Sequence, residues 1–266
     1  MCELLALNFK LPSQATFSFH GFRHRGKSNP DGWGFAYYDT NKELRLVKEH
    51  RPEADESELA GCIEQSMRKG TVFISHVRRI SKGSVAYCDT HPFYRITVEP
   101  ANKRYREWVM AHNGTLAGNY RKDLKIWKYK PIGRTDSEFV FCHILHEMSL
   151  NIFSEGVEFY AWLHNILLEI NVYGHLNSII SNGDELFCYF DRDGYNGLSH
   201  VHRKAPFPHI QLKDEDLQVN LAAEKDEAQR GYVIATHPLT LGEKWESFKP
   251  GELKVFKNGE MIWSSK

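Results

Sequence analysis

The chain has 266 residues, of which 41% are hydrophobic and 13% aromatic, so it can bury a sizeable core and does not have the composition of a disordered protein. Lys+Arg and Asp+Glu both number 34, and the zero net charge excludes the basic field that binding to nucleic acid or an anionic membrane uses. No apolar stretch approaches about 18 residues, and no basic segment precedes the first apolar run. We therefore predict a cytoplasmic, single-domain protein over residues 1–266 that binds neither nucleic acid nor a membrane.

Strands are predicted towards both ends of the chain and helices between them. Period-two patterns and turn residues predict strands at 2–9, 32–39, 44–49, 71–77, 108–111, 176–180, 186–190, 232–235, 253–256 and 261–263. Apolar residues at helical spacing predict helices at 54–69, 136–150 and 156–171. Hairpin signals such as SNGDE outnumber strand-helix-strand units, which favours an α+β fold of antiparallel sheets covered by helices.

Cys2 is the first candidate for chemistry. The five cysteines are widely spaced and form no CxxC pair, so neither a disulfide framework nor a zinc knuckle is expected. Cys2 follows the initiator methionine, and its small side chain permits removal of Met1. The residue would then carry a thiol nucleophile beside its own α-amine, whose reference pKa of about 7.7 to 8.0 suits a base near neutral pH. The alternative is that Cys2 merely begins the first strand.

Asn113 and Gly114 are candidates for stabilising an oxyanion. Attack on an amide carbonyl builds negative charge on oxygen, which preorganised N–H donors stabilise. The Asn113 side chain and the Gly114 backbone would supply two such donors, directly after a strand. An ordinary Asn-Gly turn is the alternative interpretation.

Arg78 and Asp136 are candidates for binding an amino-acid head group. Arg78 ends a buried strand, and a guanidinium can bind both oxygens of a carboxylate. Asp136 begins a helix, where its carboxylate would pair with an ammonium group. The alternatives are a solvated strand end for Arg78, and for Asp136 a helix cap, alone or within a capping box from Thr135 to Glu138.

The histidines and the remaining motifs predict no metal site and no cofactor. His143 with His146, and His200 with His202, lack acidic or cysteine partners at ligand spacing. Glycine-rich nucleotide-binding motifs and the GxSxG elbow are absent from the sequence. A papain-like pair of Cys2 with His112 or His91 remains an open alternative.

Taken together, the ordered motifs resemble the class II glutamine amidotransferase family, whose members are N-terminal-nucleophile hydrolases. Six segments occur in the family's order: Cys2 after Met1, DGWG at 31–34, HVR at 76–78, THPF at 90–93, AHNG at 111–114 and TDSE at 135–138. The stretch ATHPLT at 235–240 with the following EKWESFKPGEL resembles the stand-alone branch that includes the YafJ-like proteins. The resemblance spans almost the whole chain.

The resemblance implies a fold, a reaction and residue roles. The fold is a four-layer αββα sandwich of two antiparallel sheets, and the reaction is cleavage of the glutamine γ-amide through a γ-glutamyl thioester with release of ammonia. Cys2 matches the nucleophile, and Asn113 and Gly114 match the oxyanion hole. Arg78 matches the residue that holds the α-carboxylate, and Asp136 the one that holds the α-amine. Three further residues are expected to line the pocket: His112, Gly32 and Trp33.

Three functional alternatives follow from the same resemblance. Complete amidotransferases carry a synthase domain, whereas here the glutaminase-like part occupies all 266 residues, so an ammonia-accepting synthase would be a separate subunit. Alternatively, the protein hydrolyses γ-glutamyl peptides or amides with no ammonia acceptor. The third alternative is a non-catalytic sensor that binds glutamine.

Overall fold

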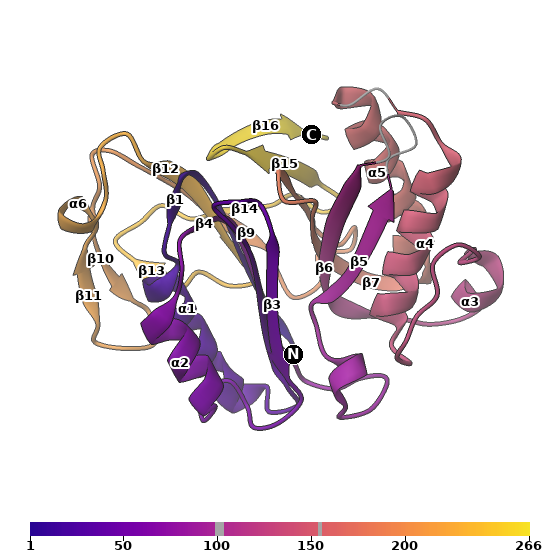
Figure 1. Cartoon of the computed structure of the whole chain (residues 1–266), viewed down its shortest axis with the longest axis horizontal. Coiled ribbons are helices and arrows are strands. Elements are labelled where there is room, and N and C mark those ends of the chain that lie inside the picture. The colour runs from indigo at the N-terminus through magenta and orange to yellow at the C-terminus, as the bar shows by residue number, and fades with distance from the viewer. Residues whose placement is uncertain (99–103, 154–155) are drawn as a thin grey trace.

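The computed structural model describes residues 1–98, 104–153 and 156–266, which form four layers (Figure 1). Two antiparallel sheets lie face to face, and helices cover the outer face of each sheet. The predicted α+β fold, an αββα sandwich, is therefore confirmed. Within the described ranges, no helix combines the length and the apolarity needed to cross a membrane.

Sheet A is the larger sheet and carries the N-terminus. Its first strand, β1, lies between β12 and β4, so it is a central strand with antiparallel partners on both sides. In spatial order its strands are β14 (Glu246–Ser247), β9 (Ser199–Lys204), β12 (Arg230–Ala235), β1 (Glu3–Ser13), β4 (Gly70–Val77), β2 (Trp33–Asp39) and β3 (Leu44–Glu49).

Sheet B lies opposite sheet A, and a small third sheet stands beside them. In spatial order sheet B has β16 (Glu260–Ser264), β15 (Leu253–Lys257), β8 (Glu185–Tyr189), β7 (Gly174–Ser181), β6 (Tyr105–Leu116) and β5 (Phe93–Val98). The third sheet has β11 (Gln218–Asn220), β10 (His209–Leu212) and β13 (Thr240–Leu241).

Helices α1 (Thr16–Arg23) and α2 (Glu58–Ser66) pack on sheet A, and α4 (Asp136–Leu150) and α5 (Val157–Ile170) pack on sheet B. Short helical segments connect the larger elements: α3 (Tyr120–Asp123), α6 (Leu221–Glu224), η1 (His24–Ser28), η2 (Tyr87–Asp89) and η3 (Asn171–Tyr173). Side-chain caps begin three of the helices: Ser57 accepts from the Ala60 N–H in α2, Thr135 from the Glu138 N–H in α4, and Asn220 from the Ala222 N–H in α6. Thr135 is therefore the N-cap of α4, and Asp136 is its first helical residue.

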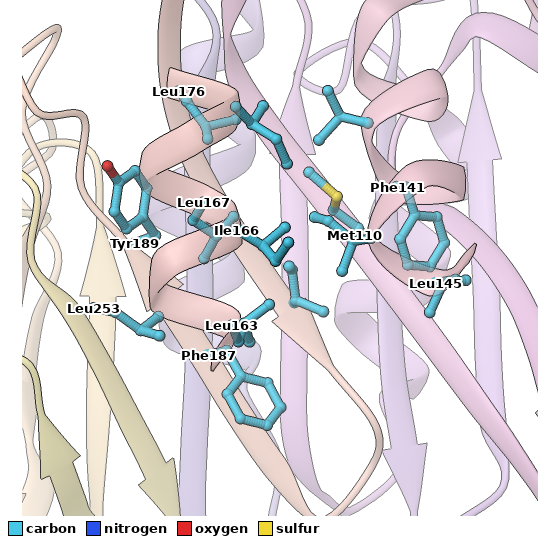
Figure 2. Close-up of a cluster of buried hydrophobic side chains, with 14 of the residues drawn as sticks. Met110, Phe141, Leu145, Leu163, Ile166, Leu167, Leu176, Phe187, Tyr189 and Leu253 are labelled. Atoms are coloured by element: carbon cyan, nitrogen blue, oxygen red, sulfur yellow. The ribbon is translucent and has the colours of Figure 1, made fainter. Parts of the chain in front are cut away.

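Three apolar clusters separate the four layers. One fills the space between the two sheets, and the others lie beneath the two helical layers. Figure 2 shows the cluster under α5, where Leu163, Ile166 and Leu167 face Phe187 and Tyr189 of β8. Burying each such side chain stabilises the fold by about 1.5–3 kcal/mol, so this cluster holds α5 firmly against sheet B.

Two local differences from the predicted elements affect the site. Helix α1 was not predicted because its sequence, TFSFHGFR, combines aromatic residues with a glycine, and its stability comes from burying Phe19 and Phe22 on sheet A. Strand β6 continues to Leu116 instead of ending near Ala111. The Asn113-Gly114 pair is therefore part of a strand and not of a turn, because it pairs with β7.

Candidate active site

Strand alternation decides which side chains meet between the two sheets. Leu4 of β1 lies in the core between the sheets. Cys2 is two residues earlier, just before β1, so its side chain lies in the same row, on the same face of sheet A. In β6, Ala111 lies in that core, and Asn113 follows it in the same row. The two rows meet, because the Asn113 Nδ2 donates a hydrogen bond of 2.6 Å to the main-chain oxygen of Cys2.

The Cys2 thiol is half-buried and contacts the backbone of the segment after β4. Its Sγ lies 3.1 Å from both the N–H and the carbonyl oxygen of Arg79. Burial raises the pKa of the Cys2 thiol, and this effect outweighs the opposing influence of the Arg79 backbone and the Arg78 charge. A thiol in this position stays protonated near neutral pH and requires a base before it can attack.

A second asparagine joins the site from a loop that the sequence analysis did not single out. The Asn196 Nδ2 donates to the same Cys2 oxygen at 3.1 Å, so two side-chain amides converge on one atom. Asn196 has a positive φ of 57°, which asparagine tolerates better than most residues. Its sequence signal is one of the four Asn-Gly pairs of the chain, the one that lies between β8 and β9.

The edge of β6 beyond Met110 provides the other feature of the predicted oxyanion hole. Strand β5 pairs with β6 only up to Met110, whereas β7 follows the other edge of β6 to Leu116. In an antiparallel strand, N–H groups alternate between the two edges. The Leu116 N–H points away from β7, because it donates to the Asp136 Oδ2 at 2.7 Å. The Gly114 N–H, two residues earlier, therefore points to the same open edge.

Arg78 is a buried cation whose guanidinium carries more N–H donors than its two carbonyl partners use. Its side chain is 3% exposed, and its guanidinium donates to the carbonyl oxygens of Ser84 at 2.7 Å and Lys82 at 2.9 Å. Burial lowers the pKa of Arg78, and the negative charges of Asp89, Asp31 and Asp136 act in the opposite direction. Two of the five guanidinium N–H groups hold the loop, which leaves three for an anionic ligand.

Asp136 is a buried carboxylate that two backbone groups hold in place. Besides the Leu116 N–H, it accepts a 2.9 Å hydrogen bond from the Ser137 N–H. The Ser137 hydroxyl also donates to it at 3.5 Å. An ionised carboxylate offers about four acceptor positions, so one remains for a ligand. Because Thr135 caps the helix, Asp136 is not used as the cap.

Two of the predicted pocket-lining side chains face the wrong way. His112 alternates with Asn113 and points towards α4, where its Nδ1 lies 2.8 Å from the Ser137 Oγ. Trp33 lies in the cluster beneath α1 and α2 and donates to Glu49 at 3.1 Å. Both side chains point away from Cys2 for the same reason, because neighbouring residues in a strand point to opposite faces. Gly32 stays beside the site, since its carbonyl oxygen accepts from the Arg78 N–H at 2.8 Å.

His76 and His91 form a buried pair of rings, of which His91 is one of the two histidines that the sequence offers as a papain-like partner for Cys2. Their rings lie 4.2 Å apart, and none of the four ring nitrogens has a hydrogen-bond partner among the described residues. Burial, followed by the charge of Arg78, lowers the pKa of His76 to about 3. Neither ring contacts the Cys2 Sγ in a recorded hydrogen bond, so within the described residues the geometry does not favour a papain-like pair.

The neutral state of His76 predicts a loss of stability in acid. Below pH 6.5 the unfolded chain protonates this residue and the folded chain does not, so protonation favours unfolding between pH 6.5 and about 3. At pH 5.5 this residue alone is expected to lower the free energy of unfolding by about 1.4 kcal/mol relative to pH 7.5. Urea denaturation of the wild type and of His76→Leu at the two pH values measures the effect. The variant should lose less stability in acid by that amount, and the exposed-site variant His209→Leu should behave as the wild type.

Comparison with known proteins identifies the family of this chain. A family model described as "Glutamine amidotransferases class-II" matches residues 1–266. The chain is 42% identical over 266 residues to the protein MJ1515 of Methanocaldococcus jannaschii, covering all of this chain and 72% of that protein. It is 31% identical over 268 residues to YafJ of Escherichia coli K12, covering 98% of this chain and all of YafJ.

A solved structure from Pseudomonas aeruginosa PA01, described as a predicted glutamine amidotransferase, has the same fold. It superposes with a TM-score of 0.72 at 30% identity and covers 98% of this chain and 100% of that chain. The resemblance inferred from the ordered motifs is confirmed, and the chain belongs to the class-II glutamine amidotransferases.

Proposed function

We propose that this protein hydrolyses the γ-amide of glutamine, with Cys2 as the nucleophile after Met1 has been removed. The observation that carries the proposal is the meeting of Cys2 with Asn113, which brings a thiol and an amide donor together between the two sheets. Met1 is 58% exposed, so its peptide bond is open to an aminopeptidase. The residue after it is small, as such cleavage requires.

The base in this proposal is the α-amine that Met1 removal uncovers. Burial raises the pKa of the Cys2 thiol, so the thiol does not ionise unaided near neutral pH. A free α-amine has a reference pKa of about 7.7 to 8.0 and is partly neutral at that pH. It accepts the thiol proton as sulfur attacks the γ-carbonyl carbon, and it can return that proton to the leaving amine.

The negative charge that develops on the γ-carbonyl oxygen needs fixed donors. The Asn113 Nδ2 and the Gly114 N–H fit this role, because the first lies at Cys2 and the second faces the open edge of β6. Collapse of the tetrahedral intermediate breaks the C–N bond and releases ammonia. Water then attacks the γ-glutamyl thioester, which yields glutamate and restores the thiol.

Arg78 and Asp136 would select the amino-acid end of the substrate. The three spare guanidinium donors of Arg78 suit an α-carboxylate, and the spare acceptor position of Asp136 suits an α-ammonium. Gly32 supports Arg78 through its carbonyl oxygen. We propose further that the released ammonia is used by a separate synthase chain.

Intact-mass measurement with 6-diazo-5-oxo-norleucine, an electrophilic glutamine analogue, tests the proposal. The purified protein is expected to lack Met1 and to gain one adduct, and the adduct should not form in Cys2→Ala. Protein that lacks Met1 and gains no adduct would contradict a glutamine-shaped pocket. Free glutamine in excess should slow adduct formation if the analogue occupies the substrate site.

A further inference from the structure

Two histidines of one helix face a glutamate from a distant turn. His20 in α1 and His24 at its C-terminal end are four residues apart, so they lie on the same helix face. Glu215 comes from the turn between β10 and β11. The His20 Nε2 lies 2.9 Å from one Glu215 carboxylate oxygen, and the His24 Nε2 lies 3.1 Å from the other.

A second carboxylate binds the other nitrogen of each ring. The His20 Nδ1 lies 2.7 Å from Glu64 of α2, and the His24 Nδ1 contacts Asp55 before that helix. Each of these carboxylates is also paired with a cation. Arg23 lies 2.8 Å from Glu64, and Lys27 lies 3.3 Å from Asp55. Such carboxylates behind histidine ligands orient the rings and are typical of metal sites.

Hydrogen counting shows that the cluster needs extra positive charge. A neutral imidazole carries one N–H, whereas each of these rings faces a carboxylate oxygen at both nitrogens. If each Nδ1–H donates to its carboxylate, each Nε2 lone pair points at an oxygen lone pair of Glu215. Protonation of both rings would supply the missing charge, as would one divalent cation between the two Nε2 atoms and Glu215, and titration with Zn²⁺ distinguishes the two.

We propose that His20, His24 and Glu215 bind a divalent transition-metal ion of the zinc type. Two imidazole nitrogens and one carboxylate form a ligand set that Zn²⁺ accepts, with a fourth position left for water. The three ligand atoms lie within 4.8 Å of one another. Tetrahedral ligands about 2.1 Å from Zn²⁺ are about 3.4 Å apart, compared with 2.9 and 3.1 Å between each Nε2 and its Glu215 oxygen, so these two contacts need to lengthen by only a few tenths of an ångström.

The residues around the three proposed ligands affect both the access of a metal ion and the rigidity of the site. The three ligand side chains are 25%, 24% and 29% exposed, whereas the His24 Nε2 atom is itself buried and has no hydrogen-bond partner among the described residues. Arg25 lies 3.3 Å from Asp214, which already fixes the turn that carries Glu215 against α1. A bound ion would therefore link α1 and the β10–β11 turn, with α2 behind them. The sequence analysis predicted no metal site, because Glu215 is far from both histidines in the chain.

Isothermal titration of the untagged full-length protein with Zn²⁺, after dialysis against a chelator, tests the proposal. The Cys2→Ala background removes the thiol as a competing ligand and makes the outcome independent of the proposed hydrolysis. One Zn²⁺ per chain is expected. His20→Gln, His24→Gln and Glu215→Gln should each weaken binding at least tenfold, and Glu64→Gln should weaken it about 10- to 100-fold. His209→Gln, an exposed histidine of β10, is the matched control and should bind as the background does.

Two measurements keep the test decisive. Circular dichroism of each metal-free variant checks folding. If the histidine variants fail to fold, Glu215→Gln still tests the site, because it alters only a side chain in a turn. Co²⁺ in place of Zn²⁺ should give the visible absorption of a four-coordinate site without thiolate charge-transfer bands. The proposal is overturned if the background protein binds no Zn²⁺, or if it binds with an affinity that the three ligand variants share.

Discussion

Glutamine hydrolysis is expected to fall at least about 1,000-fold when Cys2 is replaced with alanine, since no covalent intermediate can form without the thiol. Alanine and serine at this position are both small, so Met1 removal should be preserved and the variants should differ from the wild type only in the nucleophile. The measurement is the rate of glutamate formation from glutamine, with intact mass confirming that Met1 is gone.

Cys62→Ala provides the matched control for a general effect of thiol loss, because Cys62 is an exposed thiol on α2. Its rate should equal that of the wild type. If Cys2→Ala and Cys62→Ala hydrolyse glutamine equally well, the proposed nucleophile is wrong and the reaction uses another group. Cys2→Ser should retain at most a small fraction of the activity, because a hydroxyl is harder to ionise than a thiol.

Replacing Asn113 with alanine is expected to lower kcat about 100- to 1,000-fold and to change KM little. The Asn113 amide is proposed to stabilise charge that exists only while the γ-carbonyl is under attack, and loss of such a donor affects the transition state more than substrate binding. Steady-state kinetics of the same glutamate assay separates the two constants.

Asn113 also donates to the Cys2 main-chain oxygen, so movement of the thiol out of position is a competing explanation for a lower kcat in Asn113→Ala. The rate of Cys2 alkylation by iodoacetamide distinguishes loss of oxyanion stabilisation from movement of the thiol. In alkylation the thiol displaces iodide from carbon, and no oxyanion forms. We expect alkylation at a near wild-type rate alongside the fall in kcat. Slow alkylation would show that Asn113 positions the thiol instead, and Asn196→Ala, which removes the other donor to Cys2, provides the comparison.

The general fold and the order of the motifs were predictable from local patterns. Turn residues mark the hairpins, and apolar spacing marks α4 and α5, because these signals lie within a few residues of one another. The motifs alone do not show that the side chains of Trp33 and His112 point away from Cys2. Trp33 is the first residue of β2 and follows Gly32, and His112 and Asn113 are adjacent in β6, so alternation along each strand sets which side chains face Cys2.

The features that the sequence did not reveal depend on pairing between distant segments. Asn196 reaches Cys2 only because β8 and β9 belong to different sheets, so that the loop between them crosses the end of the sandwich. Glu215 reaches His20 and His24 only because a hairpin of the third sheet lies beside α1. Neither proximity leaves a local pattern, since nothing in the residues around one partner specifies the other.

The central position of β1 has a consequence for the order in which the chain acquires its site. Cys2 is synthesised first, yet its two amide donors are 111 and 194 residues further along, and β12, which flanks β1, comes later still. Contacts over such separations carry the largest loop-closure entropy, so they form only when most of the chain is available. A nascent chain or a fragment ending before β8 therefore carries the thiol without the complete set of groups around it, and the proposed hydrolysis would be restricted to the finished fold.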